Sequence, residues 1–441
     1  MLRGRVTKMA ASGRRQHGKE KLRPVRAVTW VGTILLVVAS LPLSAEKPIS
    51  ADAIVDSIGI NVHLHYTDTP YNNFALVQSL LTGLGVRHIR DGVVDTTWDE
   101  YYKRHNELGR EGIHCIFVTA PAQSDTLLAT YPSKMPASFE GYEAPNEYNQ
   151  ANDPHWDDTL KSFLPRLYRI TKKNPALAGR SIVVGPSLTQ PDAYPKLAGL
   201  QQYFDFANIH NYFGGRNPGT GGWGGGGYGS IDWNLQLAHE AWGQTPIMTT
   251  ETGYTTDLAN KQGIPESVEA KYMPRLILEQ LLHHVRRTYI YELIDVGPKV
   301  SKNDAAFGLV RNDGSKKPAY TALQSLIKIA RSPGQPVLED LPYRLSGNSS
   351  NVHHLLARRV DGSYLFFFWI EKPSFDVDSK KSITVPLQDL AFTYPGKIRS
   401  LQLMAFGPDG SYVTRNIKAG PTIALQASDC LSVLKIDTEG T

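Results

Sequence analysis

The chain has 441 residues, enough for one large α/β domain and a second domain of about 100 residues. Its formal net charge of +5 suggests a nucleic-acid partner, but residues 1–45 hold nine of the 47 basic residues and one of the 42 acidic residues. The remainder has 38 basic and 41 acidic residues, a net charge of −3. The positive charge therefore belongs to the N-terminal segment, and nucleic acid is excluded as an expected partner.

Residues 1–45 have the composition of a targeting segment. A start rich in Lys and Arg precedes an apolar run from Ala27 to Leu43, and Leu43-Ser44-Ala45 resembles a signal-peptide cleavage site. We therefore expect the protein to be exported, to a periplasm or to the cell exterior. The alternative is an uncleaved signal anchor, which would keep its basic side in the cytoplasm and attach the protein to a membrane.

From residue 55 onward, short β-prone runs alternate with helical stretches, which is typical of βα units. Eight such runs occur in order, and the longest helical stretch, 267–286, follows the seventh. The pattern predicts an α/β fold in which residues 46–330 form a (β/α)8 TIM barrel. The predicted strands are 58–65, 86–90, 113–119, 139–147, 181–185, 206–212, 246–251 and 288–295.

A second domain is predicted beyond the linker 332–336, which reads Ser-Pro-Gly-Gln-Pro. Residues 331–441 contain short β-prone runs divided by Asp-Gly, Pro-Gly and Pro-Asp-Gly turns, which is typical of an all-β sandwich. Residues ahead of the first barrel strand are expected to add an edge strand to it. Cys115 and Cys430 fall in different domains, so two buried thiols are favoured over one interdomain disulfide. Two cysteines offer no zinc-binding spacing.

Two glutamates end predicted barrel strands. Glu147 ends the fourth strand, in FEGYEAPNE, and Glu251 ends the run IMTTE of the seventh. The 104 positions between them correspond to three βα units of about 35 residues, so both carboxylates should reach the C-terminal mouth of one barrel. Two carboxylates across one pocket are the catalytic groups of a glycosidase. The alternative, a solvated surface acid, fits less well because each glutamate ends an apolar strand.

These motifs resemble those of clan A glycoside hydrolases, which carry Asn-Glu at the end of strand 4 and Glu at the end of strand 7. Within the clan, the chain looks most like family 39-type enzymes and related exopolysaccharide-processing hydrolases. The resemblance implies a retaining hydrolase that acts on a carbohydrate without a cofactor or metal, with Glu147 as acid/base and Glu251 as nucleophile. Asn146 would hydrogen-bond the sugar 2-hydroxyl, although an Asn after a Pro is also typical of a turn.

Other residues are expected to contact the sugar or the two glutamates. By the resemblance, His210 and Tyr212 on the sixth strand orient the nucleophile, and a buried aromatic pair is the alternative. Arg90, at the end of the second strand, would keep the Glu251 carboxylate ionised, or else pair with Asp91.

Three further segments bear on the pocket. His65, after the first strand, and Tyr291, where the clan often carries Trp, are expected to contact the sugar. Trp223 lies in the glycine-rich segment 214–230, which is expected either to be a flap that stacks aromatic rings on the sugar or to be a disordered insertion. Glu143 is expected to lie deeper in the barrel than Glu147 and to play a structural part.

Two other classes of function stay open. A noncatalytic carbohydrate-binding barrel would share the fold, because a fold does not imply an activity. Metal-dependent amidohydrolases begin with a His-x-His motif such as His63-x-His65, and Asp295 matches their eighth-strand Asp. That class would also need a Lys on strand 4 and a His on strand 5, and neither is present, so it is the less favoured alternative.

Overall fold

The computed structural model describes residues 44–175, 177, 180–297 and 305–439. The predicted leader, apart from its last two residues, lies outside these ranges. Within them, no helix is long and apolar enough to cross a membrane.

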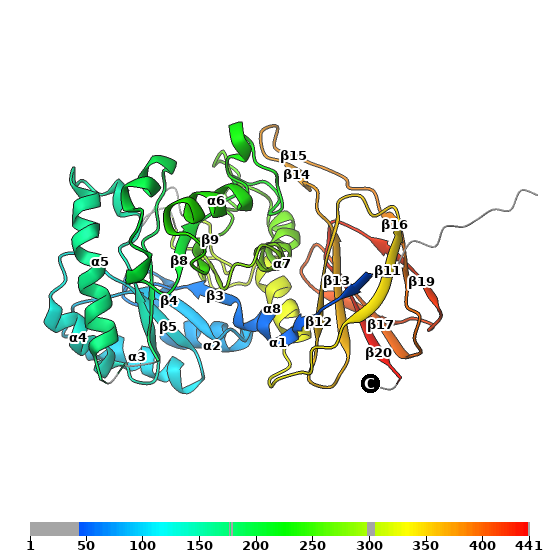
Figure 1. The fold of residues 1–441 in the computed structure, drawn as a ribbon, viewed down its shortest axis with the longest axis horizontal. Coiled ribbons are helices and arrows are strands. Elements are labelled where there is room, and N and C mark those ends of the chain that lie inside the picture. The colour runs from blue at the N-terminus through cyan, green and yellow to red at the C-terminus, as the bar shows by residue number, and fades with distance from the viewer. Residues whose placement is uncertain (1–43, 176, 178–179, 298–304, 440–441) are drawn as a thin grey trace, which may run out of the picture. The chain divides into compact units, whose positions relative to one another are not determined.

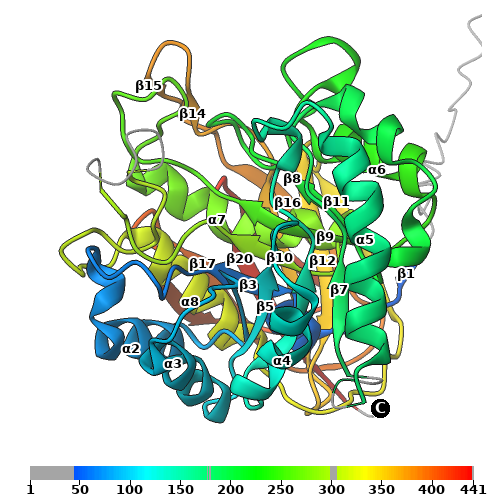
Figure 2. The same cartoon turned by 90° about the vertical axis from the view of Figure 1, so that its left-hand side faces the viewer.

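An eight-stranded parallel sheet forms the barrel, as predicted (Figure 2). Neighbouring strands pair in the order β7-β6-β5-β4-β3-β10-β9-β8, and a parallel bridge between Val184 and Phe206 joins the two ends of this series. Six of the eight strands are shorter than predicted, whereas the second and seventh have the predicted lengths and continue past Arg90 and Glu251. The eight strands are β3 (Ile58–Asn61), β4 (His88–Gly92), β5 (His114–Val118), β6 (Phe139–Glu143), β7 (Ile182–Val184), β8 (Ala207–His210), β9 (Ile247–Thr252) and β10 (Thr288–Ile290).

Helices follow most of the strands, because each parallel crossover must cover one side of the sheet. They are α1 (Ala51–Asp56), α2 (Phe74–Leu84), α3 (Asp99–Arg110), α4 (Asp125–Lys134), α5 (Trp156–Lys173), α6 (Ile231–Trp242), α7 (Glu266–Leu282) and α8 (Pro318–Ala330) (Figure 1). Helix α4 was not predicted, since DTLLATYPSK has no clear apolar face and contains Pro132. Its start is nevertheless capped, because the Ser124 hydroxyl accepts a hydrogen bond from the Leu127 amide.

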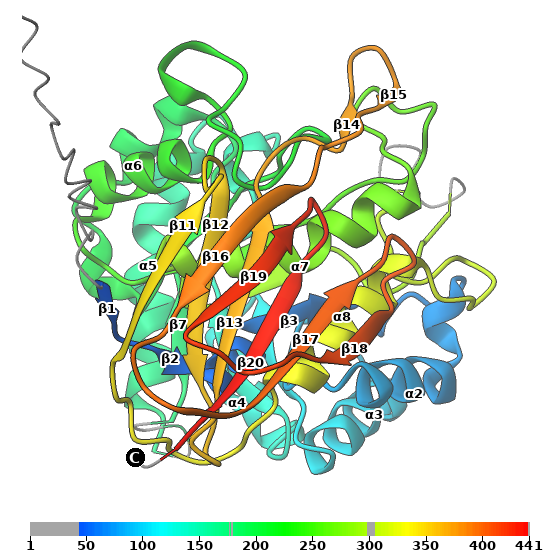
Figure 3. The same ribbon diagram turned by 90° about the vertical axis from the view of Figure 1, so that its right-hand side faces the viewer.

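The C-terminal residues form two sheets, whose own strands pair antiparallel, and a small hairpin, which confirms the predicted sandwich (Figure 3). One sheet has the order β1-β11-β16-β19, and the other has the order β18-β17-β20-β13-β12-β2. Their strands are β1 (Ser44–Glu46), β2 (Ile49–Ser50), β11 (Leu341–Gly347), β12 (Val352–Arg358), β13 (Tyr364–Ile370), β16 (Gln388–Thr393), β17 (Ile398–Phe406), β18 (Tyr412–Asn416), β19 (Thr422–Ala427) and β20 (Ser432–Thr438), and the hairpin is β14 (Phe375–Asp376) with β15 (Lys381–Ser382).

The expected strand from ahead of the barrel is present, and there are two of them. Strand β1 pairs with β11, and β2 pairs with β12. The sandwich therefore draws strands from both ends of the described chain. Cys115 and Cys430 are both buried free thiols, which confirms the preferred expectation.

Strand β13 lies between two hydrophobic cores, which explains why its sequence YLFFFWI is apolar throughout. Its seven residues are all buried. Alternate side chains of a strand point to opposite faces. Accordingly, Leu365, Phe367 and Trp369 join the core that includes the barrel helices, while their neighbours join the core between the two sheets.

A buried carboxylate joins the sandwich to the barrel. Glu371, directly after β13, pairs with Arg275 of α7, and both side chains are at most 1% exposed. The same carboxylate accepts hydrogen bonds from the Asn217 side chain and the Gly219 amide, in the loop that follows β8. The packed sandwich thus fixes a barrel loop that begins close to the candidate site.

Candidate active site

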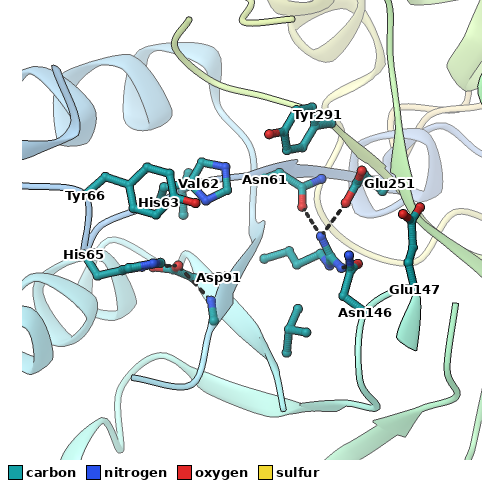
Figure 4. A pocket seen from close by; sticks show the side chains of 13 residues that line it. Asn61, Val62, His63, His65, Tyr66, Asp91, Asn146, Glu147, Glu251 and Tyr291 are labelled. Atoms are coloured by element: carbon teal, nitrogen blue, oxygen red, sulfur yellow. Dashed lines mark hydrogen bonds and ion pairs between the residues drawn. The ribbon is translucent and has the colours of Figure 1, made fainter. Parts of the chain in front are cut away.

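A pocket of about 410 Å³ opens where the barrel strands end (Figure 4). Parallel strands deliver their C-terminal residues to one face of a barrel, which is where the sites of barrel enzymes form. Residues from several strands line this pocket: Asn61, Val62, His63, His65, Tyr66, Arg90, Asp91, Gly92, Val118, Asn146, Glu147, Glu251 and Tyr291.

Arg90 of β4 forms the floor of the site and is 6% exposed. Its Nε and Nη2 donate to the two oxygens of Glu143, at 2.7 and 2.9 Å. The remaining donors reach upward, Nη1 to Glu251 at 3.0 Å and Nη2 to Asn146 at 2.6 Å. Burial alone would lower the pKa of Arg90, but the charges of Glu143 and Glu251 raise it, so the guanidinium stays charged. The guanidinium therefore holds Glu251 and Asn146, two residues of the pocket wall, at the same time.

Glu143 lies deeper in the barrel than Glu147, as expected. It ends β6, is 0% exposed, and both of its oxygens are occupied by Arg90. A buried carboxylate is stable only with such partners.

Glu251 projects into the pocket because strand β9 carries a bulge. The register pairs Ile209 with Thr249 and His210 with Glu251, so Thr250 has no partner opposite. A bulge of this kind re-aims side chains, and here it turns both Thr250 and Glu251 toward the barrel interior. The Tyr212 hydroxyl donates to Glu251 at 2.7 Å.

The environment of Glu251 favours the ionised form. Burial alone would raise the pKa of this carboxyl, but His210, Arg90 and the Tyr212 hydrogen bond together lower it below its ordinary value. A carboxylate with a lowered pKa is suited to act as a nucleophile at neutral pH.

Glu147 lies four residues beyond the end of β6, in a sharp turn. Its φ of 42° and ψ of 37° are in the left-handed region, which non-glycine residues adopt rarely. The turn is secured because the Glu147 amide donates to the Ser187 hydroxyl at 3.0 Å. Its Oε1 lies 2.8 Å from His210 Nδ1.

The two glutamates face one pocket from different sides of the barrel mouth. One oxygen of each carboxylate and a ring nitrogen of His210 all lie within 4.8 Å of one another. Figure 4 shows Glu147 and Glu251 side by side, with Asn146 and Asn61 next to them. The spacing places both carboxylates within reach of one bond of a bound molecule.

The opposite side of the pocket is aromatic and histidine-rich (Figure 4). His63 stacks on Tyr66 with ring centroids 4.5 Å apart, and His65 lies against the same tyrosine. Each histidine is backed by a buried acid, since His63 lies 3.3 Å from Glu292 and His65 lies 3.4 Å from Asp91. One ring nitrogen of each therefore faces an acid beneath the pocket wall.

Asp91 was weighed as a partner of Arg90, but the structure pairs it with histidines instead. Burial would raise the pKa of Asp91, yet hydrogen bonds from His105 and His65 lower it well below its usual range. Arg90 makes its contacts with Glu143 and Glu251.

The residues of the metal-hydrolase alternative do not converge. Asp295 is bound to Lys317 at 2.9 Å, and His63 and His65 contact two different acids. The grouping of Glu147, Glu251 and His210 is also poorly suited to a cation, because both His210 nitrogens already have partners and Arg90 lies beside Glu251.

The expected site residues divide into three groups. Arg90, Asn146, His65 and Tyr291 line the pocket together with the two glutamates, whereas His210 and Tyr212 reach it through their hydrogen bonds to Glu147 and Glu251. His210 thus contacts the expected acid/base, while Tyr212 contacts the expected nucleophile.

Trp223 forms the third group, because it does not line this pocket. It stacks on Arg216 and lies against Tyr228, which in turn contacts Trp233. A Cβ on Gly229 would lie 2.2 Å from the Trp223 ring, so the glycine lets the chain close over it. A contact between Trp223 and a sugar stays a prediction.

Sequence reasoning missed the polar residues that connect the site from below, chiefly Asn61, Ser187 and Thr250. Asn61 ends β3 and accepts from Arg90 at 2.7 Å, and Thr250 lies 3.0 Å from His210 Nε2. The only signal was their position, at or after the C-terminal end of a barrel strand.

Neither a protein-family model nor a curated protein matches the chain. Among solved structures, it is similar to a family 39 glycoside hydrolase from the gut symbiont Bacteroides cellulosilyticus WH2, with a TM-score of 0.61, 16% identity and coverage of 88% of this chain and 82% of that one. It is also similar to a family 39 enzyme from Xanthomonas axonopodis pv. citri (TM-score 0.59, 16% identity, 89% and 96% covered).

A monomeric β-xylosidase from Caulobacter crescentus CB15 is similar over 90% of this chain and 98% of that one, at 14% identity and a TM-score of 0.58. At these identities the likeness establishes the fold. The barrel-plus-sandwich architecture of family 39 enzymes, expected from the sequence motifs, is confirmed.

Proposed function

We propose that the protein is a retaining glycoside hydrolase that cleaves O-glycosidic bonds of an oligo- or polysaccharide with two glutamates. The observation that carries the proposal is the contrast between two nearby carboxylates. His210, Arg90 and Tyr212 outweigh burial and lower the pKa of Glu251, while Glu147 shares a 2.8 Å contact with a nitrogen of His210. Paired carboxyl groups in different environments are the arrangement from which acid and nucleophile roles follow.

In the proposed reaction, Glu251 attacks the anomeric carbon while Glu147 protonates the departing oxygen. The resulting glycosyl ester on Glu251 is then hydrolysed by a water molecule that loses its proton to Glu147. Retaining enzymes hold their two carboxyl groups about 5 to 5.5 Å apart, and inverting ones hold them farther apart. The separation of at most 4.8 Å between one oxygen of each glutamate supports the retaining course.

Asn146 and the histidine-rich wall are proposed to hold the sugar. The Asn146 amide oxygen accepts from Arg90, which leaves its NH2 group to donate to a sugar hydroxyl. His65, Tyr291 and Tyr66 present polar and aromatic surface to the same space.

The test is a screen of aryl glycosides, beginning with the xylosides, glucosides and arabinofuranosides that the similar structures' names suggest. On a cleaved substrate, Glu251→Gln should abolish turnover, and Glu147→Gln should spare an activated phenol more than a natural leaving group. Azide should rescue Glu147→Gln, since it attacks without a general base.

Glu240→Gln, an exposed helix position, is the matched control and should be unaffected. Sugar binding without any cleavage would favour the noncatalytic barrel, and loss of activity on chelation would favour a metal-dependent hydrolase.

We also propose that the leader exports this domain. Strand β1 contains Ser44 and Ala45, so cleavage after Ala45 would remove two of its three residues. An uncleaved anchor, or cleavage farther upstream, would leave that strand whole. A fusion of residues 1–50 to a reporter active only outside the cytoplasm should be active, and an inactive fusion would contradict export.

A further inference from the structure

Thr250 immediately precedes Glu251 in β9 and is connected to Glu147 through His210. The bulge in β9 turns its side chain inward beside Glu251, and it is 0% exposed. Its hydroxyl contacts three groups at once, namely His210 Nε2 at 3.0 Å, Glu143 Oε1 at 3.0 Å and Asn208 Oδ1 at 2.8 Å. A hydroxyl carries one proton, so these three contacts cannot all accept from it.

Two of the three partners act as acceptors. Glu143 Oε1 receives an N–H from Arg90 and another from Asn208. The orientation of the Asn208 amide is also fixed, because its Nδ2 donates to Glu143 and to the Gly185 carbonyl. The remaining Oδ1 receives the Thr250 backbone N–H at 3.3 Å. Neither of these oxygens carries a proton, and both lie within 3.0 Å of the Thr250 oxygen. Lone pairs would face each other in both contacts unless the hydroxyl proton of Thr250 points to the Glu143 and Asn208 side.

The third contact then has one solution. With its proton turned toward Glu143 and Asn208, the Thr250 oxygen can only accept from His210, so Nε2 must carry a hydrogen. In a neutral imidazole the other nitrogen, Nδ1, is then an acceptor. That nitrogen lies 2.8 Å from Glu147 Oε1. Two acceptors at this distance repel each other unless a proton lies between them.

We propose that Thr250 is a positioning residue that fixes the tautomer of His210, so that His210 Nδ1 and Glu147 retain one shared proton for the leaving group. This inference rests on the proposed glycosidase function and assigns its proton source. In the first step the shared proton passes to the glycosidic oxygen as the C–O bond breaks and Glu251 forms the ester. The pair is left as neutral His210 and the Glu147 carboxylate.

In the second step the attacking water returns one proton to this pair, and the ester bond to Glu251 breaks. Protons and charge balance over the cycle, and no further reactant is needed.

Replacing Thr250 by Val removes the group that fixes the tautomer. His210 can then place its hydrogen on Nδ1, where it donates to the Glu147 carboxylate and stabilises the deprotonated acid. The pair should lose its proton at lower pH. Glu251, Tyr212 and Tyr194 also face the pair, and Arg90 lies behind Glu251; all four keep their contacts in this variant. Glu143 and Asn208 each lose their contact with the Thr250 hydroxyl.

The kinetic test is the pH profile of kcat/KM on a glycoside with a poor leaving group. The alkaline limb of Thr250→Val should move about one pH unit toward acid, the size of one hydrogen bond to a charged group. Thr250→Ser retains the hydroxyl and should keep the wild-type profile. Thr249→Val makes the same change at the neighbouring buried threonine, whose hydroxyl faces Gln280 at 3.5 Å. This control variant should also keep the wild-type pH profile.

An unmoved limb in Thr250→Val, whatever its rate, would overturn the inference, as would a Thr250→Ser limb displaced equally. A measurement that needs no substrate is the ring-nitrogen NMR spectrum of wild-type His210. It is recorded at a pH above the alkaline limb of the activity profile, or at any alkaline pH if no cleaved substrate has been found. His210→Gln would identify its signals among those of the 13 histidines. An Nε2–H tautomer is expected, and an Nδ1–H tautomer would refute the inference. Failure to cleave any glycoside would instead count against the proposed function alone.

Discussion

Arg90→Met should destabilise the barrel severely. The substitution removes every donor that Arg90 offers, two of them to Glu143, and leaves that carboxylate 0% exposed without its counter-charge. Removing one partner of a buried ion pair costs about 3–5 kcal/mol, because the other charge stays desolvated. Urea unfolding at pH 7, followed by tryptophan fluorescence, should show a loss of this size in the free energy of unfolding.

The double variant Arg90→Met with Glu143→Gln separates the charge from the packing. An uncharged glutamine can still accept from Thr250 and Asn208, so it should restore about 2 kcal/mol relative to the sum of the two single losses. Arg90→Lys retains the positive charge but not the planar guanidinium that binds both Glu143 oxygens. Its free energy of unfolding should therefore lie between those of the wild type and Arg90→Met. Additive losses in the double variant, or a loss below about 1 kcal/mol in Arg90→Met, would refute the assignment of Arg90 as the charged floor of the site.

Three further outcomes are expected. Tyr212→Phe removes a donor from Glu251, so the acidic limb of kcat/KM should move about half a pH unit upward, and an unchanged limb would contradict the contact. Glu371→Gln leaves Arg275 buried without its partner and should lower the unfolding free energy by about 3 kcal/mol; unchanged urea unfolding would contradict this. Burial raises the pKa of Glu269 to about 8, so its stability contribution is complete below the unfolded pKa near 4.3 and is lost as pH rises to 8. Glu269→Gln should therefore become more stable relative to wild type between pH 5 and pH 8, measured as the thermal midpoint, and a constant difference would contradict the shift.

The fold, and the convergence of Glu147 and Glu251 on one pocket, could be predicted because both depend on regular patterns. Strands and helices alternate, and the spacing from Glu147 to Glu251 equals three βα units. Neither observation requires knowledge of how side chains meet.

The connections beneath the site depend on register and could not be predicted. A strand without a bulge would point Thr250 and Glu251 in opposite directions, and nothing in IMTTET signals the bulge. The pairing of Asp91 with His65 and His105 joins segments that only the folded barrel brings together. Trp223 shows the same limit, because its glycine-rich surroundings indicated a loop but not that the ring would stack on Arg216.

The central claim is that Glu251 forms a covalent bond to the sugar. An activated 2-deoxy-2-fluoro glycoside of a cleaved sugar slows the second step more than the first, so the ester should accumulate. Mass spectrometry of a proteolytic digest should then show one added fluorosugar on the peptide that contains Glu251. The adduct should be absent from Glu251→Gln and present in the Glu240→Gln control. A sugar attached to Glu147 instead, or turnover of the cleaved substrate with inversion and no adduct, would contradict the account.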